Sequence, residues 1–288
     1  MPAPGDERLF MAGTLAEALA ALADRGSEGA ALAGGTWIMR APIRRESSAQ
    51  FHVGIGRIPE LNAIDVAADR IRIGACVTHS QLVAGLVGIA SCNGLVTAAG
   101  SAANPAIRSM ATVGGNLSAC DFPAADLPPA LLCLDAEVEV GVNGGGMQRL
   151  PIERFLATRK NLEPGTLVTG ITISRQPVLT GHARLPLRKA GDYPVAIVSI
   201  SATIGRDGLV EDARIAVGSV ESSARRWPQL EQRLKGLALD GHKAGTLAEA
   251  ELGVFTGRDA VEAPGWYRVQ VLPALVRRAV QAALSSHS

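Results

Sequence analysis

Hydrophobic residues recur along the chain with the spacing of helices in some segments and of strands in others. Residues 14–25 have the pattern of an amphipathic helix, in which Thr14 and Glu17 form a capping box and Gly26 follows the last turn. Residues 29–35, with the sequence GAALAGG, predict a short buried strand that ends at a glycine pair. The chain is therefore expected to begin with a helix, a strand and a glycine turn.

The middle of the chain predicts strands that alternate with short helices. Residues 70–75 (RIRIGA) alternate as a strand, and Thr78 with Gln81 forms a second capping box that begins a helix. Residues 136–152 contain two alternating segments on either side of an NGGG sequence. This pattern predicts a β-hairpin whose glycines serve only the turn.

The last third of the chain predicts antiparallel strands followed by helices. Proline, glycine and polar residues gather at residues 174–184, which is a candidate domain boundary. Two strands are expected around a turn at Asp207-Gly208, and helices over residues 223–237 and 266–284. Pro273 is expected to kink the last helix or to mark its restart.

Runs of strands followed by runs of helices favour an α+β fold over a doubly wound sheet. The expected division is a first domain over residues 1–175, made of subdomains at about 1–56 and 57–175, and a second domain over residues 176–288. The second domain is a small α+β unit with an antiparallel sheet. At 288 residues the chain is long enough to bury a substantial core in either part.

Charge and hydropathy exclude several kinds of partner. The chain has 28 Lys and Arg residues against 27 Asp and Glu residues, so no basic surface for nucleic acid or an anionic membrane is expected. Residues 1–22 lack a basic region followed by an apolar run, and the longest apolar stretch, residues 82–92, is too short to span a bilayer. We therefore expect a cytoplasmic protein without membrane insertion.

Neither the cysteines nor the histidines have the spacing of metal ligands. The four cysteines are far apart without a Cys-x-x-Cys pair, and the five histidines form no ligand pattern. No metal site and no iron–sulfur cluster held by this chain alone is predicted. The sequence also has no convincing Ser/His/Asp or Cys/His arrangement, so no catalytic residue is predicted.

Two glycine pairs outside the hairpin are the candidate chemistry. Gly34-Gly35 and Gly114-Gly115 each follow apolar residues and precede a hydrogen-bonding side chain, Thr36 or Asn116. Consecutive glycines can adopt positive φ and turn N–H groups toward one anion such as a pyrophosphate, although each pair can equally be a tight turn. No P-loop or Rossmann fingerprint is present, so these rules alone indicate only a possible nucleotide binder.

The chain resembles the FAD-binding medium subunit of the molybdenum hydroxylases, the family of carbon monoxide dehydrogenase and xanthine dehydrogenase. The resemblance implies a two-subdomain FAD-binding domain followed by the small C-terminal domain. It rests on segments in the family's order that together span most of the chain: LAGGTW (32–37), RIPELNAI (57–64), IRIGACVTHSQL (71–82), residues 107–140 around ATVGGNLSACDFPAAD, LRKAGDYPVAIVSISATI (187–204) and YRVQVLPALVRRAV (267–280).

By this resemblance the loops 33–38 and 111–116 hold the FAD pyrophosphate and the adjoining ribityl chain, while Asp126 and Lys189 lie near the flavin. Without the resemblance, Asp126 could be a helix N-cap and Lys189 a solvated surface charge. The chain departs from the commoner family pattern at Trp37 and at Cys120-Asp121-Phe122, and Trp37 or Tyr193 could cover a flavin face. The implied cofactor-binding residues are Ala33, Gly34, Gly35, Thr36, Trp37, Ile38, Ala111, Thr112, Val113, Gly114, Gly115, Asn116, Asp126 and Lys189.

The implied function is electron transfer through FAD in a three-component enzyme. A large molybdopterin-binding subunit would oxidise the substrate, a small [2Fe–2S] subunit would carry electrons to FAD, and FAD would deliver them to an external acceptor, with the whole assembled as a dimer of heterotrimers. Two alternatives are a self-sufficient FAD-dependent oxidase and a flavin-free assembly subunit.

Overall fold

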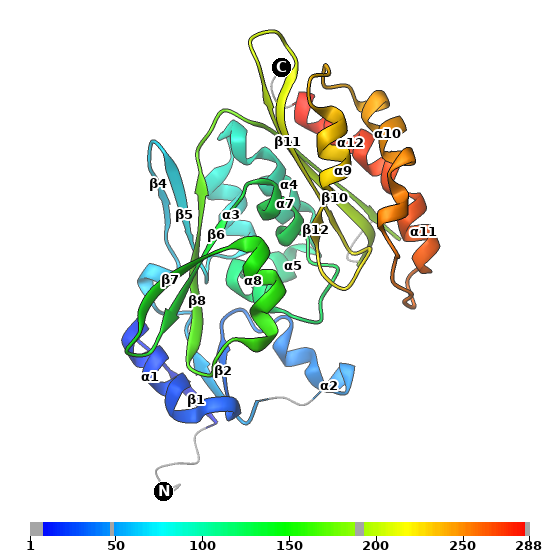
Figure 1. Ribbon diagram of the computed structural model, residues 1–288. Helices are drawn as coiled ribbons and strands as arrows, with labels where there is room; N and C mark the ends of the chain where they lie inside the picture. Colours follow the sequence, from blue (N-terminus) through cyan, green and yellow to red (C-terminus); the bar gives the residue numbers. More distant parts are fainter. Residues whose placement is uncertain (1–7, 47–48, 188–192, 286–288) are drawn as a thin grey trace, which may run out of the picture.

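The computed structural model describes residues 8–46, 49–187 and 193–285, and Figure 1 shows their arrangement. The chain begins with a three-stranded parallel sheet in the order β1-β3-β2. Helix α1 packs against β2 and β3, and its predicted capping box between Thr14 and Glu17 is confirmed. The elements are β1 (Leu9–Met11), α1 (Leu15–Arg25), β2 (Gly29–Leu32), α2 (Ala41–Arg44) and β3 (Phe51–Gly54).

The central part of the chain forms a five-stranded antiparallel sheet in the order β4-β5-β8-β6-β7, packed against short helices. The predicted hairpin is confirmed as β6 and β7. The strands are β4 (Ile64–Val66), β5 (Arg70–Gly74), β6 (Glu137–Val142), β7 (Gly146–Pro151) and β8 (Thr166–Ser174). The helices are α3 (His79–Leu86), α4 (Asn93–Ser101), α5 (Pro105–Arg108), α6 (Val113–Ser118), α7 (Leu127–Cys133) and α8 (Ile152–Thr158).

The C-terminal part forms a four-stranded antiparallel sheet in the order β12-β11-β10-β9. Pro273 lies at the start of α12, directly after α11 ends, so the predicted restart is confirmed. The elements are β9 (Leu179–Pro186), β10 (Pro194–Ile204), β11 (Val210–Gly218), β12 (Arg225–Arg226), α9 (Pro228–Leu234), α10 (Gly241–Ala250), α11 (Gly265–Gln270) and α12 (Leu272–Ser285).

Helices cover both faces of the C-terminal sheet. Helix α12 contacts β9 and β10, whereas α4 and α7 from the central part also contact strands of this sheet, which lies between the two groups in Figure 1. The first nine residues of β10 are buried without a break, and its apolar sequence does not alternate because neither face of the strand meets water. The α7 helix is buried over its whole length for the same reason.

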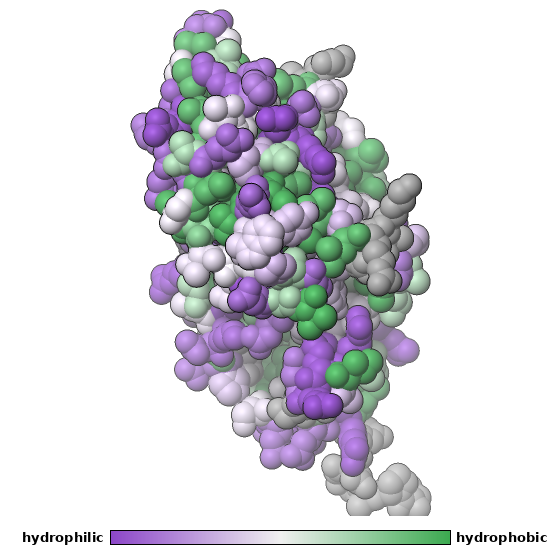
Figure 2. Space-filling view, turned by 90° about the vertical axis from the view of Figure 1, so that its right-hand side faces the viewer, coloured by the Kyte–Doolittle hydropathy of each residue, from purple (hydrophilic) through white to green (hydrophobic). Residues whose placement is uncertain are grey.

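The predicted α+β fold, with its antiparallel C-terminal sheet, is confirmed. The helices of the described segments include none that is both long and apolar enough to cross a membrane. Figure 2 shows the side of the molecule that carries the C-terminal helices, where apolar and polar side chains are intermixed and hydrophilic residues prevail in the lower part. The fold thus places the five-stranded sheet and the C-terminal sheet around the central helices α4, α6 and α7.

Candidate functional site

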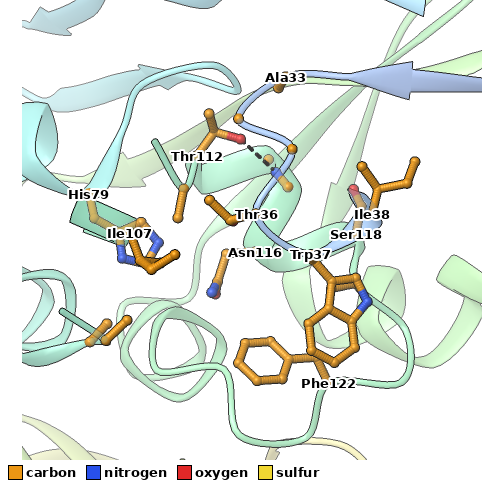
Figure 3. A pocket seen from close by; sticks show the side chains of 18 of the residues that line it. Ala33, Thr36, Trp37, Ile38, His79, Ile107, Thr112, Asn116, Ser118 and Phe122 are labelled. Carbon is orange, nitrogen blue, oxygen red and sulfur yellow. Dashed lines mark hydrogen bonds between the residues drawn. The ribbon is translucent and has the colours of Figure 1, made fainter. Parts of the chain in front are cut away.

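The two glycine-containing segments predicted to act together do meet in the structure. A Cβ atom added to Gly34 would lie 1.7 Å from the carbonyl oxygen of Met110, so only glycine allows the turn after β2 to touch the backbone that leads into α6. Both segments line one pocket of about 570 Å³, a volume typical of cofactor and small-molecule sites. Figure 3 shows side chains from both segments around this pocket.

The segment Ala33–Ile38 presents main-chain donors that the protein itself does not use. Gly35 has φ +69°, which bends the chain sharply after the strand. Among the described residues, no acceptor takes a hydrogen bond from the backbone N–H groups of residues 34–38, whereas the N–H of Met39 donates back to Gly35. A run of unused N–H groups on a sharply turned backbone is the arrangement that binds anions.

The segment around Gly114 is built differently from the prediction. It forms the first turn of α6, and neither Gly114 nor Gly115 has positive φ. The prediction that this pair uses positive φ to turn its N–H groups toward one anion is therefore wrong. The N–H of Gly114 donates to Ala75, and the N–H of Gly115 donates to the Thr112 hydroxyl that caps the helix. These amides are therefore occupied by the protein.

Close packing explains the glycines at the start of α6. A Cβ on Gly114 would lie 2.7 Å from the Cβ of Ala75, and one on Gly115 would lie 2.9 Å from the Thr112 hydroxyl oxygen. Larger residues would separate α6 from the turn after β5 or would displace the helix cap. Thr112 and Asn116 remain at the pocket surface, where their side chains are available to a ligand.

Most of the predicted cofactor-binding residues line this pocket. Val113 is the first difference, because it lies in the hydrophobic core and not among the lining residues. Lys189 is the second, because it lies outside the residues that the structure describes. The predicted residues at the pocket are Ala33, Gly34, Gly35, Thr36, Trp37, Ile38, Ala111, Thr112, Gly114, Gly115, Asn116 and Asp126.

Asp126 lies at the pocket wall but does not cap α7, although it directly precedes that helix. Its buried carboxylate lies 2.9 Å from Nε of Arg184 and 3.5 Å from Nε2 of His182. The other ring nitrogen of His182 lies 2.9 Å from the hydroxyl of Ser199. Because β9 and β10 supply these partners, the C-terminal sheet neutralises and positions the aspartate, and Arg184 itself lines the pocket.

Aromatic residues form another part of the wall. The rings of Trp37 and Phe122 have centroids 4.5 Å apart, and Phe122 meets Tyr193 edge-on at 5.2 Å. The guanidinium of Arg44 lies 3.8 Å from the centre of the Trp37 ring. Trp37 and Phe122 come from the two stretches that depart from the commoner family pattern, so the two departures are in direct contact.

Sequence reasoning missed His79, which is the first residue of α3 and lines the pocket. Its side chain and that of Asn116 are directed into the pocket in Figure 3. Among the described residues, the two ring nitrogens of His79 make no hydrogen bond of good geometry. The amide oxygen of Asn116 likewise lacks one. The THSQ sequence revealed the helix cap but gave no indication that the histidine is buried beside the second glycine pair.

The pocket therefore has the chemical groups that a dinucleotide requires. Free N–H groups near Gly35 suit a diphosphate, buried polar side chains await hydrogen-bond partners, and aromatic and apolar walls suit a planar ring. The residues present thus fit FAD. When bound, FAD supplies the redox chemistry, and the protein's part is to bind and orient it.

Comparison with known proteins agrees with this description. Residues 6–175 match the family described as FAD binding domain in molybdopterin dehydrogenase, and residues 184–283 match the CO dehydrogenase flavoprotein C-terminal domain. The 6-hydroxypseudooxynicotine dehydrogenase complex subunit alpha of Paenarthrobacter nicotinovorans is 30% identical over 277 residues, which cover 95% of this chain and 93% of the relative.

Carbon monoxide dehydrogenases are among the other similar proteins. The medium chain from Afipia carboxidovorans is 29% identical over 285 residues, or 97% of each chain. A chain of the reconstituted CO dehydrogenase from Oligotropha carboxidovorans superposes with a TM-score of 0.87 at 27% identity and covers 98% of this chain and 99% of its own length. The chain therefore belongs to the family of FAD-binding subunits of molybdenum hydroxylase-type dehydrogenases, and its cofactor is FAD.

Proposed function

We propose that this chain is the electron-transfer subunit of a molybdenum-containing dehydrogenase. Its FAD would accept electrons from iron–sulfur clusters of a small partner and pass them to an external acceptor, while a large molybdopterin-binding partner oxidises the substrate. The observation that carries the proposal is the meeting of the Gly34 turn and the start of α6 at one pocket with unused main-chain donors. A pocket of this kind holds a cofactor, and no catalytic side chain needs to be invoked.

Within the pocket we propose distinct roles for the two segments. The N–H groups of residues 34–38 would bind the FAD diphosphate, because the protein leaves them without acceptors. Thr112 and Asn116 would contribute side chains from the other wall, since the amides of α6 are already occupied. Asp126, neutralised by Arg184, would accept hydrogen bonds from hydroxyl groups of the cofactor.

We further propose a cytoplasmic complex organised as a dimer of heterotrimers. The names of relatives support a complex of several different chains, because one relative is called a subunit of a complex and another a medium chain.

We also propose that the boundary between the two domains lies between residues 175 and 176. The two family matches end and begin on either side of it, at residues 175 and 184.

Electron transfer is tested by separating this chain from its partners. The chain should be purified with FAD both alone and with the products of neighbouring genes, and flavin reduction should be followed by the loss of visible absorbance under anaerobic conditions. We expect reduction by the organic substrate only in the complex. A flavin that the substrate reduces in the isolated chain would identify a self-sufficient oxidase instead.

A second arm of the same experiment tests the direction of transfer. The reduced complex should be mixed with candidate acceptors, including NAD, a quinone and dioxygen, and flavin reoxidation should be recorded. Complexes assembled without this chain provide the control. If such complexes pass electrons to the same acceptor at the same rate, the proposed role in electron transfer is wrong.

A further inference from the structure

His79 is buried at the pocket in a position where the protein does not satisfy it. Only 3% of the residue is exposed, and its backbone N–H donates to the carbonyl of Ala111 at 2.9 Å. This bond holds α3 beside the segment that begins α6. Among the described residues neither ring nitrogen makes a hydrogen bond of good geometry, although the backbone of Ala99 interacts with the ring, and Figure 3 shows the ring directed into the pocket. A buried polar group without a partner is destabilising unless a ligand satisfies it.

The imidazole is neutral at physiological pH. Burial lowers the pKa of His79 to about 4, Arg108 also acts to lower it, and the carboxylate of Asp126 and the backbone of Ala99 act to raise it. Asp126 is itself paired with Arg184, and Arg108 donates to the carbonyls of Ala102 and Ala103. A neutral imidazole offers one N–H donor and one nitrogen acceptor. It is therefore suited to an uncharged ligand group with both functions.

The surroundings of His79 differ from those of the Gly35 turn. Ala102, Ala103 and Ile107 are apolar members of the pocket lining on the α4–α5 side, and the N–H of Ala111 ties its segment to Ile107. The unused main-chain donors lie instead on residues 34–38. Apolar walls with neutral hydrogen-bonding side chains, His79, Asn104 and Asn116, favour a heteroaromatic ring over a phosphate.

We propose that the imidazole of His79 forms a hydrogen bond with a heteroaromatic ring of the bound FAD. The inference rests on the FAD site described above and adds a binding residue to it. FAD contains two such rings, the isoalloxazine and the adenine, and both carry ring nitrogens and exocyclic polar groups. His79 is a binding residue and takes no part in electron transfer.

The main test measures FAD affinity in the full chain. Apoprotein carrying His79→Leu, His79→Gln or His242→Leu should be titrated with FAD and with ADP by calorimetry. We expect His79→Leu to weaken FAD binding about ten- to one-hundred-fold, because a ring atom of the cofactor loses its partner. His79→Gln should recover most of the affinity, and His242→Leu, which replaces an exposed histidine on α10, should bind like the wild type.

The ADP titration distinguishes the two rings. If His79 contacts the adenine, His79→Leu should weaken ADP binding by the same factor as FAD binding. If it contacts the isoalloxazine, ADP affinity should stay unchanged while the visible spectrum of bound FAD shifts. Each result supports the proposal. FAD affinity within twofold of the wild type in a folded His79→Leu protein would overturn it.

A measurement on the wild-type protein covers the case in which His79→Leu does not fold. Nitrogen-15 spectra of the histidine side chains should be recorded with and without FAD and assigned with His79→Gln. A hydrogen bond to the cofactor should shift the ring nitrogens of His79 and slow the exchange of its N–H proton. Unchanged resonances would contradict the proposal. Neither experiment depends on partner subunits, so failure of the electron-transfer role would not affect the result.

Discussion

Gly34 and Met110 are in contact through their main chains, with no room for a side chain between them. A Cβ on Gly34 would lie 1.7 Å from the Met110 carbonyl oxygen and 2.7 Å from the carbonyl carbon. This contact joins the turn after β2 to the segment before α6. Since each segment contributes a wall of the pocket proposed to hold FAD, the width of that pocket depends on a single glycine.

Replacement of Gly34 by alanine should therefore open the junction and damage the pocket. We expect a loss of about 1–3 kcal/mol in the free energy of unfolding, because rigid backbone must move to accept the methyl group. FAD affinity should fall as well, by at least about tenfold, because a loss of about 1.4 kcal/mol in binding free energy corresponds to a tenfold weaker affinity. Chemical denaturation and FAD titration measure the two effects.

Gly56→Ala is a matched control for this experiment. A Cβ on Gly56 would meet no atom within 4 Å, and its φ is not positive. The control should bind FAD and unfold like the wild type. If Gly34→Ala behaves in the same way as Gly56→Ala, the contact with Met110 does not define the pocket.

The contact between the rings of Trp37 and Phe122 should add to the free energy of unfolding beyond what each ring contributes alone. Their ring centroids are 4.5 Å apart at an angle of 31°, which allows favourable interaction beyond the burial of apolar area. A double-mutant cycle with Trp37→Ala and Phe122→Ala should give a coupling of about 1 kcal/mol in the free energy of unfolding. Trp37→Ala combined with Trp266→Ala serves as a control, because Trp266 makes its ring contact with Tyr267. A coupling no larger than in the control would show that the two rings act independently.

The four cysteines should differ in their reaction with alkylating reagents. Burial raises the pKa of Cys76 to about 12 and also raises the pKa values of Cys92 and Cys133, so these thiols are both shielded and protonated. Cys120 is only half-buried and lines the pocket, although burial raises its pKa too. We expect iodoacetamide to modify Cys120 at least about ten times faster than the others, and FAD to slow that reaction.

Mass spectrometry of peptides would measure each rate of alkylation. Protein unfolded in urea, where all four thiols should react alike, provides the reference. Equal labelling of Cys76 and Cys120 in the folded protein would contradict the prediction, as would a rate at Cys120 that FAD leaves unchanged.

The burial of His79 should make the protein less stable in mild acid. The imidazole has a pKa of about 4 in the folded chain against an ordinary value of 6.5. Between these values the unfolded chain binds a proton that the folded chain does not, so stability falls as the pH decreases from about 6.5 toward 4. His79→Leu removes this contribution and should lose stability less steeply across the same range.

Urea unfolding of the apoprotein at several pH values gives the two slopes. His242→Leu removes an exposed histidine on α10 and should keep the slope of the wild type. Asp126 and its ion-pair partners His182 and Arg184 are unchanged in all three proteins. Identical slopes in His79→Leu and the wild type would show that His79 is charged in the folded chain or is not buried.

Local signals in the sequence were sufficient for many elements of this fold. The capping boxes at Thr14 and Thr78 predicted the starts of α1 and α3, because a cap is formed by residues three positions apart. The β6–β7 hairpin and the restart at Pro273 were predictable for the same reason. The family resemblance predicted a set of FAD-binding residues, and most of them line one pocket.

Tertiary structure decided how the two glycine pairs differ. Gly35 adopts positive φ in a free turn, whereas Gly114 lies in a helix and is required because the turn after β5 passes too close for a Cβ. His79 and Arg184 likewise became part of the site through packing of α3 and β9 against the same pocket. Close approach and burial depend on residues that are distant in the chain, and such contacts leave no periodic pattern in the sequence around either residue.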